Sequence, residues 1–515
     1  MAHEDDVVAG WIETASPVLG RWVSAEPLES IQRLNAIQAL VDECLEVLEV
    51  GLFDAIFSRL RERAAEEGGR CSVCGLGCER ERKSVRVRTT RCTLDVEVWR
   101  YRCRSCRTNR SPVREWLGLE SGATTAGLDR ALTALSTQMS FGSAAQQMAE
   151  QHGHDVDRTL VERRTYAVGQ DAVAYLDERD TERLQEVMDA VGVRRGTDQV
   201  FVQVDSGAVP VGELVRPKRN PMDKGQELTP VRGLPKGRRP KTKREVRVVV
   251  AWRPGQVDDK VVNLHVAPLK HPEVTGQAMY VAALEAGMGD NTHMHGTFDM
   301  AQWQALQFDE QFGMQPRATI CADFFHTLEY VAGASKALQP DADKVKSWIA
   351  MQARRLKEGG REAILVDLRA HSCKGHACPK NDKDECVVTA ANRYLTRNGQ
   401  HMDYPRFIAE GLPIGSGEVE GRIRHIVRRR LDVPGDWREE NLVLLTALLT
   451  IRHSGRWDDF WDWQDRRDKK RFQRRLLREG LNRFRGPRQP RLVTEGTEKL
   501  DLDGLSPMFQ ARDMN

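Results

Sequence analysis

Strand-like and helix-like segments alternate along the sequence between Gln199 and Leu338. The run QVFVQVDSGAVPV predicts a first strand, and further strand-like runs are EVRVVVAWR, VVNLHVAP, HMHGTFD and ATICAD. The runs TGQAMYVAALEAGM and FFHTLEYVAGASKAL have the apolar spacing of helices. This alternation is typical of an α/β core, in which helices pack on the faces of a sheet. We therefore expect the first part of such a core over residues 196–335.

The rest of the chain predicts further parts around this core. Residues 1–66 carry apolar residues at helical spacing and predict a helical N-terminal arm, whereas residues 336–400 predict a helical insertion. The core is expected to resume over residues 401–463, and the Arg-rich tail, residues 464–515, is expected to be poorly ordered. The chain is thus predicted to be a multidomain α+β protein, since its length suggests roughly two to four domains.

Two Cys-x-x-Cys pairs flank a segment of alternating strand residues. Cys71 and Cys74 precede this segment, and Cys103 and Cys106 follow it. Four thiolates suit tetrahedral zinc, and a two-residue spacer lets each turn present two sulfurs to one ion. We expect residues 67–116 to form a zinc ribbon with a closed structural site.

Other cysteines are less well placed for metal binding. Cys78 and Cys92 are competing ligands near the ribbon, and we interpret them as bystanders. Five further candidate ligands lie in the insertion, namely His371, Cys373, His376, Cys378 and Cys386. Their spacing fits no common zinc pattern. An ordinary surface loop is the favoured interpretation, and a metal site stays open.

Residues 117–195 return to a helical pattern and contain a candidate helix-turn-helix. A helix over Gly142–His152, a turn at Gly153 and a second helix from about Asp157 have the length and turn chemistry of this motif. A plain helical hairpin would have the same pattern. The DNA-binding interpretation is favoured by three basic residues of the second helix, Arg158, Arg163 and Arg164.

A strongly basic segment follows the first core strand. Between Val211 and Val250 there are twelve Lys or Arg residues and four Asp or Glu residues. Such a surplus of positive charge attracts a polyanion, although a disordered hairpin tip is the alternative. We expect the basic loop, residues 211–247, to contact DNA through residues that include Lys236, Arg238, Arg239, Lys241, Lys243 and Arg244.

Neither end of the chain nor its interior predicts a membrane or secretory segment. The N-terminal sequence MAHEDDVVAGW is acidic and lacks the features of a secretory signal. The longest strongly apolar run, Leu442–Ile451, is shorter than the roughly 20 residues of a membrane-spanning helix. We expect a cytoplasmic protein without a membrane partner.

Three carboxylates are the candidate catalytic residues. Asp205 lies at the end of the first core strand, Asp299 follows a later strand, and Glu420 follows the turn GSG at the start of a helix. Spacing alone does not show that they meet. If the fold brings them together, their oxygen atoms suit two Mg²⁺ or Mn²⁺ ions about 3.5 to 4 Å apart, which would clamp a phosphodiester.

Basic and acidic neighbours extend this candidate site. Arg424 and Arg428 lie four and eight residues after Glu420, hence on much the same helix face, where they would neutralise phosphates. A surface ladder of Glu–Arg salt bridges is the alternative. Asp323 and His326 begin the helix after ATICA and would supply an alternative metal ligand or support one. A simple helix cap explains them equally well.

Taken together, these motifs resemble the bacterial insertion-sequence transposases of the ISKra type, which are relatives of the Mutator-like DDE transposases. VDSGAVPV resembles the family's first catalytic strand, DMAQW its Asp-Gly-Ala-x-Trp segment, and DFFH its Asp-x-x-His element. GLPIGSGEVEGRIRHIVRRR is similar to the family's most characteristic block, and LLTIRHSGRWDDFW to its closing signature. The resemblance covers roughly Val200–Trp461.

The resemblance implies an RNase H-like catalytic core in which Asp205, Asp299 and Glu420 form the catalytic triad. Met300 stands where the family usually has Gly, which leaves Asp323 as a substitute for the second acid. Glu418 is a neighbouring carboxylate, but the family's spacing from the turn favours Glu420. The zinc ribbon and helix-turn-helix are similar to the family's region that binds terminal repeats.

The expected function is therefore that of a DNA transposase in the bacterial nucleoid. It would bind double-stranded DNA at the terminal inverted repeats of an insertion sequence, cleave it with Mg²⁺ or Mn²⁺, and join it to target DNA. Because two ends are cut together, a homodimer or larger assembly is expected. The alternatives are an RNase H-like nuclease that does not join DNA, or a transposase-derived DNA-binding protein without catalysis.

Overall fold

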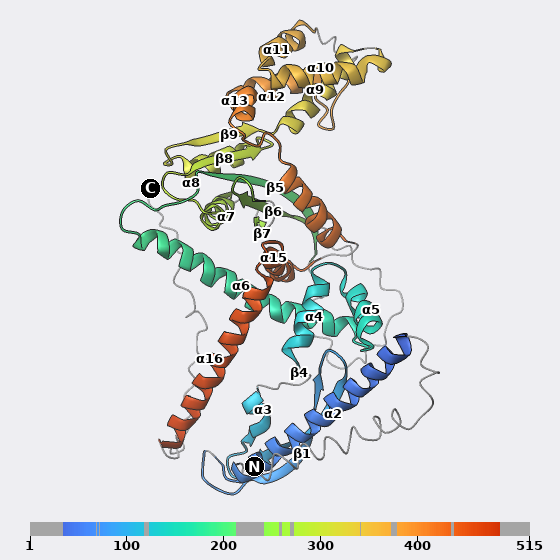
Figure 1. Ribbon diagram of the computed structural model, residues 1–515, viewed down its shortest axis with the longest axis vertical. Coiled ribbons are helices and arrows are strands. Elements are labelled where there is room, and N and C mark those ends of the chain that lie inside the picture. The colour runs from blue at the N-terminus through green and yellow to red at the C-terminus, as the bar shows by residue number, and fades with distance from the viewer. Residues whose placement is uncertain are drawn as a thin grey trace, which may run out of the picture. The chain divides into compact units, whose positions relative to one another are not determined.

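The computed structural model describes residues 34–67, 69–71, 73–117, 123–212, 242–256, 260–267, 272–339, 341–371, 378–433 and 437–484. Helices and two sheets make a mixed α+β protein (Figure 1). The chain divides into two compact units. The first comprises Met1–Val87, Leu94–Ala123 and Lys470–Asn515, and the second comprises Arg88–Thr93 and Thr124–Lys469.

The first unit contains helix α2 (Leu34–Glu67), α3 (Pro112–Leu117) and strands β1 (Glu79–Arg88), β2 (Thr93–Arg102) and β3 (Asn109–Arg110). Burial alternates along β2, as expected for a strand with one covered face. The Tyr101 hydroxyl donates to the Ala64 carbonyl at 2.8 Å, which ties β2 to α2. The predicted strand pattern is thus confirmed.

The second unit begins with three helices, α4 (Ala126–Ser136), α5 (Phe141–His152) and α6 (Arg158–Asp189). Each has an N-cap residue whose side chain accepts an amide N–H, namely Thr125, Ser140 and Asp157. Gly153 ends α5 with φ of 64°, a left-handed conformation that glycine adopts without strain. The predicted helix, turn and second helix are therefore confirmed as elements of the fold.

A five-stranded sheet forms the centre of the second unit. Its strands are β5 (Gln199–Val211), β6 (Thr242–Trp252), β7 (Val261–Ala267), β8 (His293–Phe298) and β9 (Ala318–Ala322). The strand order is β7-β6-β5-β8-β9. β5, β6 and β7 are antiparallel neighbours, whereas β8 is parallel to β5 and β9 is parallel to β8. All five strands coincide with predicted strand-like runs.

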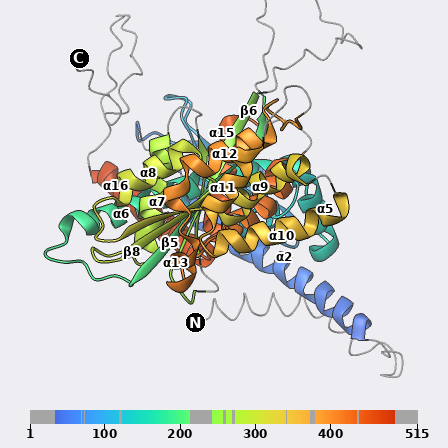
Figure 2. The ribbon, with the colours of Figure 1, turned by 90° about the horizontal axis from the view of Figure 1, so that it is seen from above.

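Helices cover both faces of this sheet. They are α7 (Pro272–Glu285), α8 (Gln302–Phe312), α14 (Gly417–Arg422) and η5 (Ile423–Leu431), whereas α9 (Phe324–Leu338) packs with later helices. Arg247 of β6 bonds to Thr275 of α7, and α7 packs beside α8 on this face (Figure 2). Gln203 of β5 bonds to the Gly415 carbonyl and the Val419 amide, so α14 covers the opposite face.

A group of helices follows α9, as the sequence predicts. It comprises α10 (Val345–Lys357), α11 (Arg361–Ala370), α12 (Val387–Arg397) and α13 (Tyr404–Ala409), with short 3₁₀ turns η2 (Ala342–Lys344) and η4 (Gly399–His401). These helices gather with α9 beyond the β9 edge of the sheet (Figure 1). At the other edge lies α15 (Glu439–His453). Thr450 of this helix and its C-cap residue Ser454 form hydrogen bonds with the backbone of β7. Side chains thereby satisfy an edge strand that would otherwise be open.

Two predicted boundaries are wrong. Helix α16 (Trp457–Phe484) continues beyond residue 464, where the poorly ordered tail was predicted to begin, and Arg467 of this helix pairs with Asp171 of α6 at 2.6 Å. The basic loop is shorter than predicted, since Val211 pairs with Thr242 and both arms are strand. Residues 213–241 between these arms, which include Lys236, Arg238, Arg239 and Lys241, lie outside the described residues.

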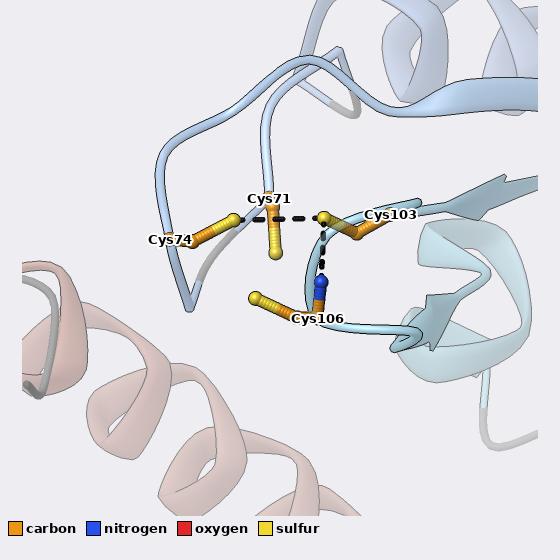
Figure 3. A group of neighbouring side chains, drawn as sticks. All are labelled: Cys71, Cys74, Cys103 and Cys106. Atoms are coloured by element: carbon orange, nitrogen blue, oxygen red, sulfur yellow. Dashed lines mark hydrogen bonds between the residues drawn. The ribbon is translucent and has the colours of Figure 1, made fainter. Parts of the chain in front are cut away.

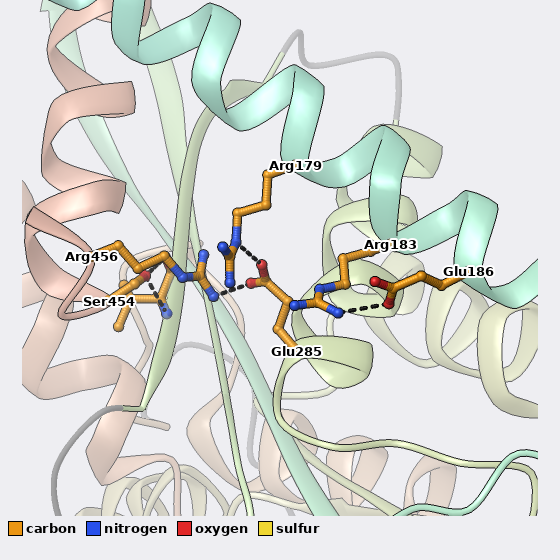
Figure 4. A network of polar contacts seen from close by, with 7 residues as sticks. Arg179, Arg183, Glu186, Glu285, Ser454 and Arg456 are labelled. Carbon is orange, nitrogen blue, oxygen red and sulfur yellow. Dashed lines mark hydrogen bonds and ion pairs between the residues drawn. The ribbon is translucent and has the colours of Figure 1, made fainter. Parts of the chain in front are cut away.

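A buried ion cluster joins three elements of the second unit (Figure 4). Glu285 at the end of α7 accepts hydrogen bonds from Arg179 of α6 and from Arg456, which precedes α16. The Glu285 side chain is only 4% exposed. Arg183 and Glu186 form a neighbouring, more exposed pair at 2.6 Å on α6. The cluster therefore connects α6, α7 and the start of α16 through one carboxylate.

In the part of the chain that the structure describes, none of the helices has the length and apolar character needed to span a membrane.

Candidate active site and metal centre

Asp205, Asp299 and Glu420 line one cavity of about 470 Å³ in the second unit. The other residues around it are Val204, Ser206, His326, Glu329, Ser416, Ile423, Arg424 and Arg428. The three acids are far apart in sequence: Asp205 lies within β5 and not at a strand end as predicted, because pairing with β6 continues to Val211, Asp299 follows β8, and Glu420 lies in α14. The fold thus brings the predicted triad together around a single space.

Asp205 lies among groups that disfavour its negative charge. Burial raises the pKa of Asp205, and the charges of Asp299 and Glu420 raise it further, while the Ser206 amide that donates at 2.7 Å lowers it. A divalent cation would relieve this repulsion, and hard cations prefer oxygen ligands of this kind. The donor set of the cavity therefore fits Mg²⁺ or Mn²⁺.

The three carboxylates are nevertheless more widely spaced than a closed metal site. Among the described residues, only Cys71, Cys74, Cys103 and Cys106 place all their candidate ligand atoms within 4.8 Å of one another. The acids border a wider space, which leaves room for a phosphodiester beside any cation.

Glu420, and not Glu418, faces the cavity. The Ser416 hydroxyl donates to the Glu420 carboxylate at 2.9 Å and holds it at the cavity wall. Glu418 instead pairs with Lys260 at 2.6 Å, and the Lys260 side chain is 11% exposed. The half-buried Lys260 already neutralises Glu418, so the geometry favours Glu420 as the third acid.

Asp323 supports the GSG turn and is absent from the cavity lining. Its side chain is fully buried and accepts the amide N–H of His326 at 2.7 Å and that of Ser416. It therefore caps α9 and fixes the turn that precedes Glu420. His326 does line the cavity, where it contacts Glu329 at 3.2 Å.

The arginines after Glu420 lie on a π-helix. In η5 the amide of Asp432 bonds to the Val427 carbonyl, five residues back, at 2.8 Å. Arg424 and Arg428 are exposed and line the cavity with Glu420. Arg430 points elsewhere, because it is buried and donates to the Ser136 carbonyl at 2.6 Å. Positive charge thus stands on one wall of a cavity otherwise rich in carboxylates.

Gly207 allows η5 to approach β5. A Cβ at this position would lie 2.6 Å from Cγ1 of Val427, which is too close for a real side chain. We expect Gly207→Ala to destabilise the fold by about 1 to 3 kcal/mol through overpacking. Denaturant unfolding of Gly207→Ala, Val427→Ala and the double variant measures this. The double variant should lose less than the two single losses combined, and simple additivity would contradict the close packing.

The four cysteines of the two Cys-x-x-Cys pairs meet in the first unit (Figure 3). The sulfurs of Cys74 and Cys103 lie 3.5 Å apart, close to the roughly 3.8 Å between ligands of tetrahedral zinc with 2.3 Å bonds. Amide N–H groups of Val73 and Cys106 point at the sulfurs of Cys71 and Cys103, each at 3.4 Å. The cluster can bind a metal such as zinc.

The protonation of these thiols differs within the cluster. Burial alone would raise the pKa of Cys71, but hydrogen bonds from Thr108 and from backbone amides outweigh it and lower the pKa to about 6. A hydrogen bond with Cys74, followed by burial, raises the pKa of Cys106 to about 12. Burial also raises the pKa of Cys78, which lies outside the group, and Cys92 contacts Thr89 at 3.5 Å.

The second group of candidate metal ligands is described only in part. The sulfurs of Cys378 and Cys386 lie 2.9 Å apart, and His371 ends α11 as its C-cap. Cys373 and His376 lie outside the described residues.

The other predicted DNA-binding residues have different surroundings. Arg158 and Arg163 are exposed on α6. Arg164 forms two hydrogen bonds with the carboxylate of Asp129 in α4, so it stabilises the three-helix part. Lys243 is exposed on β6, and Arg244 pairs with Glu439 at 2.9 Å.

Sequence reasoning missed several residues of the site. Glu329 follows His326 by three residues, so helical spacing on α9 could have suggested this pair. Ser416, Gln203 and Lys260 have no comparable signal, because each acts through a contact with a distant segment.

No protein-family model matches this chain, and no curated protein matches it.

Proposed function

We propose that this protein is a DNA transposase of the DDE type, similar to the ISKra-type family. The single observation that carries the proposal is the meeting of Asp205, Asp299 and Glu420 with Arg424 and Arg428 around one cavity. An acid-lined cavity with arginines on one wall suits a phosphodiester and cations together. The order of three antiparallel strands followed by two parallel ones supports an RNase H-like core.

The residues of the cavity have separate tasks in this proposal. Asp205, Asp299 and Glu420 would hold Mg²⁺ or Mn²⁺, and Ser416 would keep the Glu420 carboxylate in place. A bound pair of ions would lower the pKa of the attacking hydroxyl and stabilise charge on the leaving oxygen. Arg424 and Arg428 would bind the phosphates on either side of the reacting bond. Water would attack first, and the freed 3′ hydroxyl would attack target DNA next.

DNA recognition would fall to several surfaces of the chain. The second helix of the candidate helix-turn-helix, α6, would present Arg158 and Arg163 to the terminal repeat. The basic loop would follow phosphates, and Lys243 at its edge is available for this. Arg164 would not contact DNA, because its guanidinium is paired with the carboxylate of Asp129.

The cysteine cluster is proposed to be a structural zinc site. Elemental analysis should find one zinc per chain, and Cys103→Ser should lose it because one of four thiolates is gone. Since structural zinc contributes roughly 10 kcal/mol or more to folding of small domains, the sheet of β1 and β2 should then become sensitive to limited proteolysis. Cys92→Ser should keep the metal as the matched control, and full zinc retention by Cys103→Ser would contradict the assignment.

A strand-transfer assay tests the function directly. Labelled duplexes bearing the repeats that flank the gene are incubated with the protein, Mg²⁺ and a supercoiled plasmid. A transposase yields plasmid products covalently joined to the labelled end. Cleavage without joining would indicate a nuclease of the same fold, and repeat binding without either product would indicate a DNA-binding protein descended from a transposase.

A further inference from the structure

The turn that carries Asp299 has a backbone conformation that its sequence does not favour. Met300 has φ of 68°, in the left-handed region where a side chain crowds the backbone. The residue is 8% exposed, so its side chain is committed to the core. A strained conformation of this kind persists only where surrounding contacts hold it. The contacts around the turn therefore show what keeps Asp299 in place.

One of these contacts comes from the helical insertion. The hydroxyl of Tyr394 on α12 donates to the carbonyl oxygen of Asp299 at 3.1 Å. That oxygen belongs to the peptide group between Asp299 and Met300. Rotating this group changes ψ of Asp299 and φ of Met300 together. A donor fixed at the oxygen therefore resists relaxation of Met300 out of the left-handed region.

The Tyr394 side chain is itself held firmly. It is 9% exposed, and its ring stacks on Tyr330 of α9 with centroids 4.2 Å apart and planes 14° from parallel. Its ring also meets that of His326 at an interplanar angle of 79° with centroids 5.7 Å apart, and His326 lines the cavity. Burial raises the pKa of Tyr394, so the hydroxyl stays protonated and keeps its donor role at ordinary pH.

Other bonds position the same turn from within the core. The Asp299 carboxylate accepts the Ala301 amide at 3.1 Å, and Gln304 links this amide to the Val204 carbonyl, next to Asp205. These contacts fix the side chain and the start of α8. None of these three hydrogen bonds involves the Asp299 carbonyl oxygen, which accepts the bond from Tyr394.

We propose that Tyr394 is a positioning residue for the candidate active site, holding the strained Asp299–Met300 turn so that the Asp299 carboxylate faces the cavity. We call the hydrogen bond from Tyr394 to the Asp299 carbonyl the clamp. The clamp is a property of the fold, whereas its consequence for catalysis rests on the proposed function. The helical insertion would thereby help to position a residue of the candidate active site. The family's usual glycine would need no such clamp, because glycine adopts positive φ freely.

A double-mutant cycle on stability tests the clamp without any assay of activity. The variants are Tyr394→Phe, Met300→Gly and their combination, compared by the midpoint of denaturant unfolding. Tyr394→Phe should lower the midpoint in the natural background. In the Met300→Gly background at least half of that loss should disappear, because no strain remains to be held. An equal loss in both backgrounds would overturn the clamp.

The same variants test the positioning role in metal-dependent cleavage. Tyr394→Phe should lower kcat about tenfold, as expected for a lost hydrogen bond, with KM for DNA changed by less than about twofold. The double variant should recover to within about threefold of Met300→Gly alone. Tyr330→Phe, which keeps the stacked rings, serves as the matched control and should stay near the natural rate.

The outcomes separate this inference from the proposed function. Coupled midpoints with an unchanged kcat for Tyr394→Phe would overturn the positioning role. Absence of cleavage by the natural protein, under conditions where a related transposase cuts, would refute the proposed function and the positioning role with it. The midpoint cycle would still decide whether the clamp exists.

Discussion

Asp205→Asn should reduce metal-dependent DNA cleavage by about 10³-fold or more. Cation binding at a reacting phosphate is worth several kcal/mol, and each 1.4 kcal/mol is about tenfold in rate. Asp205 lies in the same cavity as Asp299 and Glu420. An amide has almost the same shape but lacks the charge that holds the cation. Single-turnover cleavage of a labelled repeat duplex measures the loss.

The same substitution should leave stability unchanged or improve it in the absence of divalent metal. Burial and two nearby carboxylates raise the pKa of Asp205 above its unfolded value, so the ionised group destabilises the fold at neutral pH. This destabilisation is fully present above the folded pKa and disappears as the pH falls through it towards the unfolded pKa. The midpoint gap between Asp205→Asn and the natural protein should therefore close on acidification.

Asp309→Asn is the matched control, because Asp309 is exposed on α8 and does not line the cavity. It should retain full cleavage. A clear loss of stability in Asp205→Asn, with cleavage and folding failing together, would contradict a catalytic role for this acid and indicate a structural one.

Glu285→Ala should destabilise the second unit by about 3 to 5 kcal/mol. Removing one partner of a buried ion pair leaves uncompensated charge in the interior. Here two arginines, Arg179 and Arg456, depend on one carboxylate that is 4% exposed (Figure 4). Denaturant unfolding followed by a signal from the second unit measures the change.

The neighbouring pair on α6 provides the matched control. Glu186→Ala breaks the bond between Glu186 and Arg183, whose side chains are 63% and 37% exposed. Exposed pairs contribute less than about 1 kcal/mol, so this variant should unfold almost as the natural protein does. Equal losses of unfolding free energy in Glu285→Ala and Glu186→Ala would contradict this prediction, because they would show that burial does not determine how much the ion cluster stabilises the fold.

Local patterns predict much of this fold because burial imposes a period on the sequence. The strand Gln199–Val211 and the helix Phe324–Leu338 have the predicted bounds, since the first is rich in β-branched residues around a continuous buried run and apolar residues recur at helical spacing along the second. Asp299 could be selected from the sequence because it follows the buried strand β8, and Asp205 because it follows the buried run of residues 200–204, although β5 itself continues to Val211.

Contacts between distant segments were beyond such reasoning. Only the resemblance favoured Glu420 over Glu418 in the sequence, whereas in the structure Glu418 pairs with Lys260, a residue distant in sequence. Arg164 has the charge of a DNA contact but pairs with Asp129, which is 35 residues away in sequence. Val427 of the π-helix η5 also packs against Gly207, which is distant in sequence. These features are set by tertiary packing, which spacing along one element does not encode.

The most direct measurement compares the natural protein with Glu420→Gln on a labelled duplex carrying the flanking repeats, in Mg²⁺ or Mn²⁺. Binding is followed by gel shift and cleavage by denaturing gel on the same samples. We expect metal-dependent nicking at the repeat end by the natural protein, with binding but no nicking by Glu420→Gln. Equal nicking by both proteins would contradict the assignment of this cavity as the active site.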